Sequence, residues 1–142
     1  MKRIFITFTL SSLSVASIAQ CAKNVIYNSG KADFIDSLGN IIHTKQGKIT
    51  VTLSKKDFVL MHDGDEEDAL RGTVKNLACE WKDAYKNGKP PFESELFEKS
   101  GEKNDAVVSI EGKEGNLLIM VRFKTKDMIL KIIPGSYTEV KE

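Results

Sequence analysis

Apolar and polar residues alternate with a period of two along much of this chain. Residues 48–54 read Lys-Ile-Thr-Val-Thr-Leu-Ser, and residues 117–124 repeat the alternation. Successive side chains of a β-strand point to opposite faces, so this pattern predicts strands with one buried and one solvent-facing side.

Three consecutive antiparallel strands are predicted between residues 105 and 133. Two alternating stretches flank residues 112–116, where two glycines and an asparagine favour a hairpin turn. A third stretch, residues 128–132, stops at Pro134-Gly135. This run is the clearest structural signal in the chain.

Shorter apolar stretches predict further strands, separated by polar turn residues. The expected strands are residues 25–27, 34–35, 49–53, 58–61 and 70–77, and the expected turns are 29–31, 37–40 and 54–57. Between Leu70 and Trp81 the apolar positions change parity. This change predicts a bulge or a strand break near Asn76.

Residues 80–87 allow two interpretations. Trp81 and Tyr85 fit helical spacing, yet they also belong to an alternating stretch that leads to Asn87-Gly88, a strong hairpin-turn dipeptide. Because the neighbouring segments are predicted strands, we favour the hairpin, with residues 92–97 as its return strand.

About nine short strands with frequent turn signals predict an all-β fold. We expect a single-domain antiparallel meander that closes into a small barrel or a strongly curled sheet, because closure removes exposed edges. By strand count alone this architecture resembles lipocalin-type barrels. The Gly-x-Trp strand signature of lipocalins is not found near the N-terminus, so no family is assigned.

The first nineteen residues have the three parts of a secretory signal peptide. Lys2 and Arg3 precede a short apolar run, and small residues end at Ala19. The run is shorter than the roughly 20 residues that cross a bilayer. We therefore expect residues 1–19 to be removed, and residues 20–142 to form an exported domain in the periplasm or the medium.

The net charge of the chain does not indicate a class of binding partner. The 142 residues include 21 basic and 20 acidic side chains, a net charge of +1, and cleavage would remove Lys2 and Arg3. Nucleic acid binding depends on neutralising phosphates, and binding to anionic membranes depends on basic clusters. A near-neutral chain favours neither.

The cysteines are Cys21 and Cys79, both within the expected mature chain. In an exported protein such a pair predicts a disulfide, which would add roughly 4 kcal/mol to stability. Two free thiols are the alternative. Lipidation of Cys21 is disfavoured because Gln20, the residue before it, is not small.

Residues 63–68 hold five carboxylates in six positions. We interpret them as a solvated turn between two strands, although Asp63, Asp65 and Glu67 form a weak candidate calcium site. The spacing does not match the twelve-residue calcium loop, since its sixth position is Asp68 rather than glycine.

No catalytic motif is present. His43 and His62 are the two histidines, and a catalytic zinc site typically needs three protein ligands. His62 precedes Asp63, which could orient it as a base. The Gly-x-Ser-x-Gly, phosphate-loop and dinucleotide signatures are absent. The sequence therefore predicts no enzyme, no cofactor and no metal centre.

The aromatic residues concentrate at Trp81, Tyr85, Phe92 and Phe97, which would face one another across the expected hairpin. We favour ordinary core packing for them, and they are also the candidates for the wall of an apolar ligand pocket.

Two functions stay open. The first is a binding protein that takes a small apolar or amphipathic ligand into a barrel cavity of several hundred Å³. The alternative is a protein-binding module, such as an inhibitor or an envelope-associated factor, acting through loops that include residues 63–68. A secreted hydrolase ranks third, because it would need His43 or His62 in a cleft beside a carboxylate.

Overall fold

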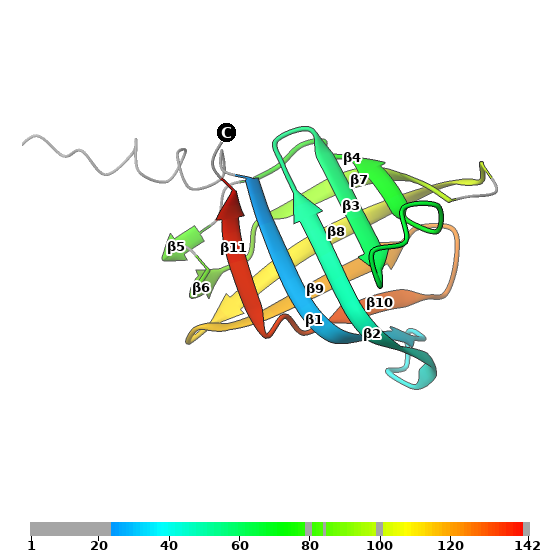
Figure 1. Ribbon diagram of the computed structural model, residues 1–142, viewed down its shortest axis with the longest axis horizontal. Helices are drawn as coiled ribbons and strands as arrows, with labels where there is room; N and C mark the ends of the chain where they lie inside the picture. The colour runs from blue at the N-terminus through cyan, green and yellow to red at the C-terminus, as the bar shows by residue number, and fades with distance from the viewer. Residues whose placement is uncertain (1–23, 79–80, 84, 99–100, 141–142) are drawn as a thin grey trace, which may run out of the picture.

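The computed structural model describes residues 24–78, 81–83, 85–98 and 101–140, and its regular elements are β-strands (Figure 1). They are β1 (Asn24–Ile35), β2 (Ile41–Leu53), β3 (Asp57–His62), β4 (Leu70–Thr73), β5 (Trp81–Asp83), β6 (Asn87–Gly88), β7 (Pro91–Phe97), β8 (Lys103–Lys113), β9 (Asn116–Phe123), β10 (Ile129–Ile132) and β11 (Ser136–Val140). Within these residues no helix has the length and apolar character needed to cross a membrane.

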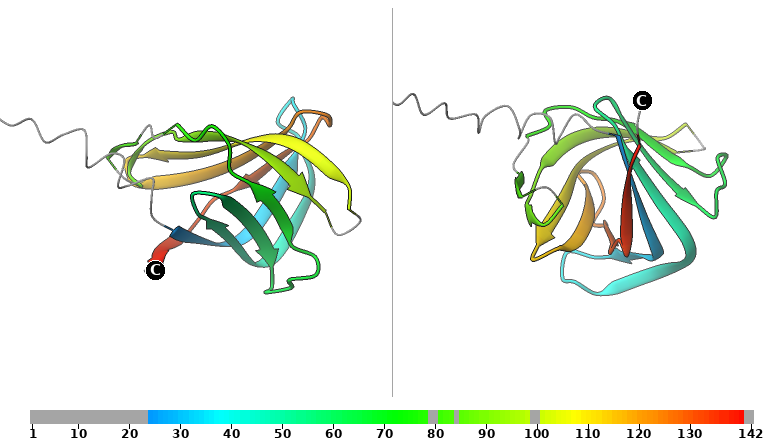
Figure 2. Two further views of the ribbon diagram at one scale, coloured as in Figure 1. Left: turned by 90° about the horizontal axis from the view of Figure 1, so that it is seen from above. Right: turned by 60° about the vertical axis from the view of Figure 1, so that its left-hand side comes forward.

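Eight of the strands form a closed antiparallel barrel. The order around the ring is β1, β2, β3, β4, β7, β8, β9 and β10, and β10 pairs with β1 to close it (Figure 2). Apart from the excursion through β5 and β6, each of the eight strands from β1 to β10 pairs with the next strand of the ring along the chain, and β11 pairs with β1. The predicted meander and its closure are thus confirmed.

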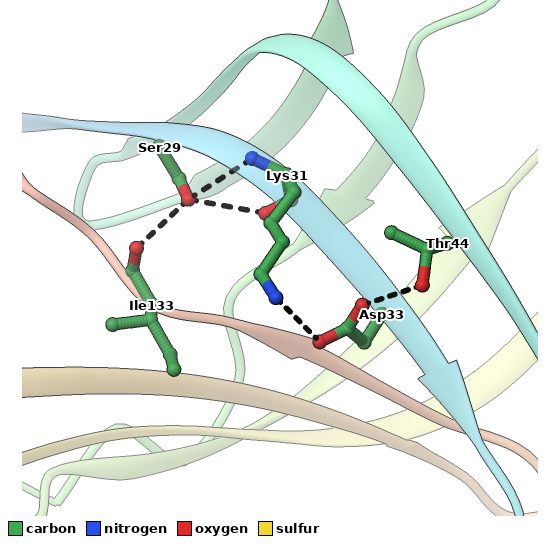
Figure 3. Close-up of polar contacts among 5 residues, drawn as sticks. All are labelled: Ser29, Lys31, Asp33, Thr44 and Ile133. Carbon is green, nitrogen blue, oxygen red and sulfur yellow. Dashed lines mark hydrogen bonds and ion pairs between the residues drawn. The ribbon is translucent and has the colours of Figure 1, made fainter. Parts of the chain in front are cut away.

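β1 changes its pairing partner halfway along. Its first half pairs with β11 and its second half with β10. Its register with β2 shifts between Ser29 and Lys31, which marks a β-bulge. At this bulge the Ser29 hydroxyl donates to the carbonyl of Ile133 at 2.8 Å, in the link between β10 and β11 (Figure 3). The predicted turn at residues 29–31 is therefore wrong, because these polar residues serve a bulge within one long strand.

Polar side chains next to the bulge join β1 to β2. The Thr44 hydroxyl donates to Asp33 Oδ1 at 2.8 Å, and Lys31 Nζ lies 3.7 Å from Asp33 Oδ2 (Figure 3). The strands end at a tight turn, where Asp36 accepts the backbone N–H groups of Asn40 and Leu38. These bonds, led by the one from Asn40, lower the pKa of Asp36.

Antiparallel pairing gives the barrel two ends. The mouth end carries the connections β1–β2 (residues 36–40), β3–β4 (63–69), β7–β8 (98–102) and β9–β10 (124–128). The hairpin end carries the β2–β3 and β8–β9 turns and the short β5–β6 hairpin. In Figure 1 the mouth end lies to the right and the β5–β6 hairpin to the left.

Inward-facing side chains fill most of the barrel. Phe58 and Phe92 are buried, and their ring centroids lie 5.9 Å apart across the interior. Each such side chain contributes roughly 1.5–3 kcal/mol relative to leaving it exposed. The fully buried residues include Ile49, Val51, Leu96, Val108, Ile110, Ile119, Val121, Leu130 and Ile132.

The strand pairing decides between the interpretations of two segments, the strand that begins at Leu70 and the segment that follows Trp81. β4 ends at Thr73, and Asn76 has a φ of 55°, so the predicted strand break near Asn76 is confirmed. Residues 81–88 form the favoured hairpin rather than a helix, with Asp83 paired to Asn87.

The details of that hairpin differ from the prediction. Its turn precedes Asn87, since Asn87-Gly88 is itself a strand in which Gly88 pairs with Gly112 of β8. Tyr85 supplies the positive φ, at 62°. The expected return strand is also wrong: β6 pairs with β5 in that place, and β7 pairs with β4 and, over seven residues, with β8.

Candidate functional site

The mouth end contains an open cavity of about 570 Å³. This volume falls within the range of about 300–1,000 Å³ that is typical of small-molecule sites. It is lined by Ala32 and Phe34 of β1, Lys45 of β2, Leu60 of β3, Asp68 and Ala69 of the β3–β4 loop, Leu70 of β4, Glu98 after β7, Phe123 of β9, and Met128 and Leu130 at β10.

The period-two pattern explains why the wall of the cavity is apolar. Phe34, Leu60 and Phe123 occupy inward positions near the mouth ends of their strands. One inward position deeper, Phe58 and Val121 are completely buried, so they belong to the packed core beneath the cavity. The cavity is therefore an apolar cup with a filled floor.

Small side chains leave room for this space. Ala32 and Ala69 line the cavity at positions where a larger side chain would project into it. A Phe at either position would add a phenyl ring to the lining and reduce the space for a ligand. The sequence gives little signal for this cavity, because Ala69 lies in a loop and Ala32 lies outside the predicted strands, so alternation assigns neither of them to the interior.

Charged groups stand at the rim. Lys45 Nζ lies 3.2 Å from Asp68 Oδ2, and Glu98 accepts a hydrogen bond from the side-chain amide of Asn104 at 3.4 Å. Asn104 is only 3% exposed, so a buried amide fixes the Glu98 carboxylate from below. The cavity can hold an apolar body and meet a polar or charged group at its opening.

The hairpin end is covered by tyrosines. Tyr85 is 6% exposed and stacks on Tyr137 of β11 with ring centroids 4.4 Å apart, while Tyr27 of β1 lies 6.5 Å from Tyr137. Burial raises the pKa of Tyr85, and the neighbouring Glu139 adds to the rise. Burial is also the largest cause that raises the pKa of Tyr27, and the nearby Tyr85 and Tyr137 raise it further.

The predicted aromatic pocket is not where the cavity lies. Phe92 packs in the core, Phe97 points outward from the same strand and is 43% exposed, and Tyr85 covers the hairpin end. Trp81 lies in β5, away from the mouth end. The cavity lining contains none of Tyr85, Phe92 and Phe97, and sequence reasoning missed the residues that form it.

The acidic segment forms the β3–β4 loop, as expected, and its side chains bind within the protein. Asp63 Oδ1 accepts the backbone N–H of Lys48 at 2.8 Å, and Asp65 Oδ1 accepts that of Glu67 at 3.0 Å. Across the described ranges, no group of three or more His, Cys, Asp or Glu side chains is placed to hold a metal ion.

The histidines lie outside the cavity lining. His62 Nε2 is 2.6 Å from the Gln46 carbonyl and 3.4 Å from Asp63 Oδ2, so its outer nitrogen donates to the backbone rather than acting as a free base. The His43 ring packs beside the Phe34 ring, and the two ring centroids lie 5.9 Å apart. Both cysteines and the expected signal peptide fall outside the described residues.

No protein-family model matches this chain, and no curated protein matches it either. The site must therefore be interpreted from its own geometry.

Proposed function

We propose that this protein is an exported, non-catalytic binding protein that takes a small apolar or amphipathic molecule into the mouth cavity. The observation that carries the proposal is the volume of about 570 Å³ with its largely aliphatic and aromatic lining. Removing apolar ligand surface from water there would contribute roughly 25 cal/mol per Å².

The proposal is supported by the fact that one end of the barrel holds an open cavity and the other end is covered by side chains. The tyrosine cluster covers the hairpin end, and the buried core lies between it and the cavity. A ligand would therefore enter and leave through the mouth end, between the β1–β2, β3–β4 and β9–β10 connections.

A neutral fluorescent probe tests the proposal directly. N-phenyl-1-naphthylamine should bind the protein with enhanced emission, and Ala69→Phe should weaken that binding about tenfold, equivalent to ~1.4 kcal/mol. The matched control is Ala78→Phe, which places the same side chain at the hairpin end and should leave binding unchanged. Equal affinity of Ala69→Phe and the parent protein would contradict the proposal.

Export belongs to the same proposal and has its own measurement. The protein purified from its native source should have the mass of a chain that begins at Gln20 and lacks the two hydrogens lost in a Cys21–Cys79 disulfide. A mass that includes residues 1–19, or acylation at Cys21, would contradict this part.

One observation favours a second candidate, a protein-binding module. Leu38, Ile41 and Ile42 at the β1–β2 connection are 85%, 63% and 59% exposed, close in the chain to cavity residue Phe34. A partner bound there and at residues 63–68 would be released by salt and by neutralising Asp65, Glu66 and Glu67 together. Binding that resists both changes would argue against this candidate.

A further inference from the structure

Acidic residues outnumber basic residues in the lining of the mouth cavity. Asp68 and Glu98 are acidic and Lys45 is basic, whereas the other lining residues are uncharged. Lys45 is already engaged, because its Nζ lies 3.2 Å from Asp68 Oδ2. The rim therefore offers a ligand more negative than positive charge.

Lys126 of the β9–β10 connection does not correct this imbalance. Lys126 Nζ lies 3.8 Å from Glu98 Oε1 and 3.7 Å from Glu102 Oε1, so one ammonium is shared by two carboxylates. The Asn104 amide hydrogen-bonds Glu98 without adding charge. A carboxylate held by a buried amide is a fixed feature of the rim.

The surroundings of the mouth extend the same sign. Among the described residues of the mouth-end connections, the acidic ones are Asp36, Asp63, Asp65, Glu66, Glu67, Asp68, Glu98, Glu102 and Asp127, and the basic ones are Lys124 and Lys126. The described turns and links of the hairpin end instead carry Lys55, Lys56, Lys75, Lys86 and Lys89 against Glu114. The described connections at the mouth end, where the cavity lies, are therefore more acidic than those at the hairpin end.

We infer that the mouth cavity selects cationic amphiphiles, molecules whose apolar body fills the cup and whose ammonium or guanidinium group lies at the rim beside Asp68 and Glu98. This inference rests on the proposed binding function and adds the charge of the ligand to it. A cleft lined by one sign of charge concentrates ligands of the opposite sign by about tenfold or more.

An anionic amphiphile fits the same cup poorly. Its headgroup would have to displace Asp68 from Lys45 and would then face the remaining carboxylates of the β3–β4 loop. A fatty acid and a cationic amine of equal chain length should therefore differ in affinity even though their apolar parts bury the same surface.

The experiment compares three probes that share a dodecyl chain: dodecyltrimethylammonium, dodecylphosphocholine and dodecanoate, each below its micelle concentration. Their affinities are measured by displacement of N-phenyl-1-naphthylamine from the full protein. We expect the cationic probe to bind about tenfold more tightly than dodecanoate at low salt. The preference should shrink in about 1 M salt, where the screening length is only ~3 Å.

Two variants test the assigned residues. Asp68→Asn combined with Glu98→Gln should abolish the preference for the cationic probe while the zwitterionic probe still binds. Glu114→Gln, which neutralises an acidic residue in the β8–β9 turn of the hairpin end, should keep the preference.

The outcomes separate this inference from the function beneath it. If the zwitterionic or anionic probe binds as tightly as the cationic one, the charge selection is overturned and the binding function stands. If none of the three probes binds, both fail. A preference that survives in the Asp68→Asn, Glu98→Gln double variant overturns the residue assignment.

Discussion

Gly72 shows how closely the barrel wall is packed. It pairs with Phe58 of β3 on one side and Leu96 of β7 on the other, and it faces the buried interior. A Cβ at this position would lie 2.6 Å from Leu96 Cδ2 and 3.1 Å from the Glu95 carbonyl oxygen. Gly72 is therefore needed because its neighbours occupy the space of a side chain, and not because of its backbone angles.

We predict that Gly72→Ala lowers the free energy of unfolding by about 1–3 kcal/mol, the usual cost of forcing extra volume into a packed core. Urea unfolding followed by far-UV circular dichroism measures the change. The matched control is Gly30→Ala, because no atom lies within 4 Å of a Cβ built at Gly30. Equal unfolding midpoints for the two variants would show that the space around Gly72 is not tight.

At the scale of the elements, the tyrosine cluster joins the β5–β6 hairpin to β1 and β11. Tyr85 comes from the hairpin turn, Tyr27 from β1 and Tyr137 from β11. Burial is the largest cause that raises the pKa values of Tyr27 and Tyr85 above the ordinary value of 10. The folded protein thus holds both phenolic protons more tightly than the unfolded chain does.

This difference predicts alkaline destabilisation. Their full contribution to stability is present below pH 10, and it falls as the pH rises above 10, because the unfolded chain then loses protons that the folded chain keeps. Each such tyrosine steepens the fall by up to about 1.4 kcal/mol per pH unit. We predict that Tyr85→Phe makes the loss of stability between pH 10 and 11 less steep.

Urea unfolding at a series of pH values measures this slope. Comparison of the two proteins cancels the titration of lysines, which both contain. Parallel curves for Tyr85→Phe and the parent protein would contradict the raised pKa of Tyr85.

Elements with many alternating positions could be predicted from the sequence, and elements defined by one contact could not. β8, β9 and β10 follow from the apolar alternation around residues 112–116. The turn before Asn87 does not, because it depends on the pairing of Gly88 with Gly112, which are far apart in the chain. Likewise, the cavity residue Ala32 lies between the strands predicted at residues 25–27 and 34–35, so the sequence pattern does not show that it lines a cavity.

At the scale of the whole molecule, the edge of β1 that faces away from β2 is covered by two different strands, one along each half of β1. Residues 32–35 pair with β10 and complete the ring, whereas residues 24–28 pair with β11, which ends the described chain. β11 therefore protects the half of β1 that the ring leaves uncovered. It also supplies Tyr137, on which the buried Tyr85 stacks.

Deleting residues 136–142 should leave the eight-strand ring closed and expose this edge. We predict a loss of about 2–4 kcal/mol in stability from the lost tyrosine packing, together with self-association that rises with concentration, because unpaired backbone groups of β1 can pair with another copy. Urea unfolding and sedimentation velocity measure the two effects, and a chain that ends at Val140 is the matched control. If the deletion variant matches that control in both measurements, β11 is dispensable and the barrel is protected at β1 by some other means. If it loses stability without associating, the tyrosine contact accounts for the role of β11, and the edge of β1 is protected by its own bulge at Ser29 and Lys31.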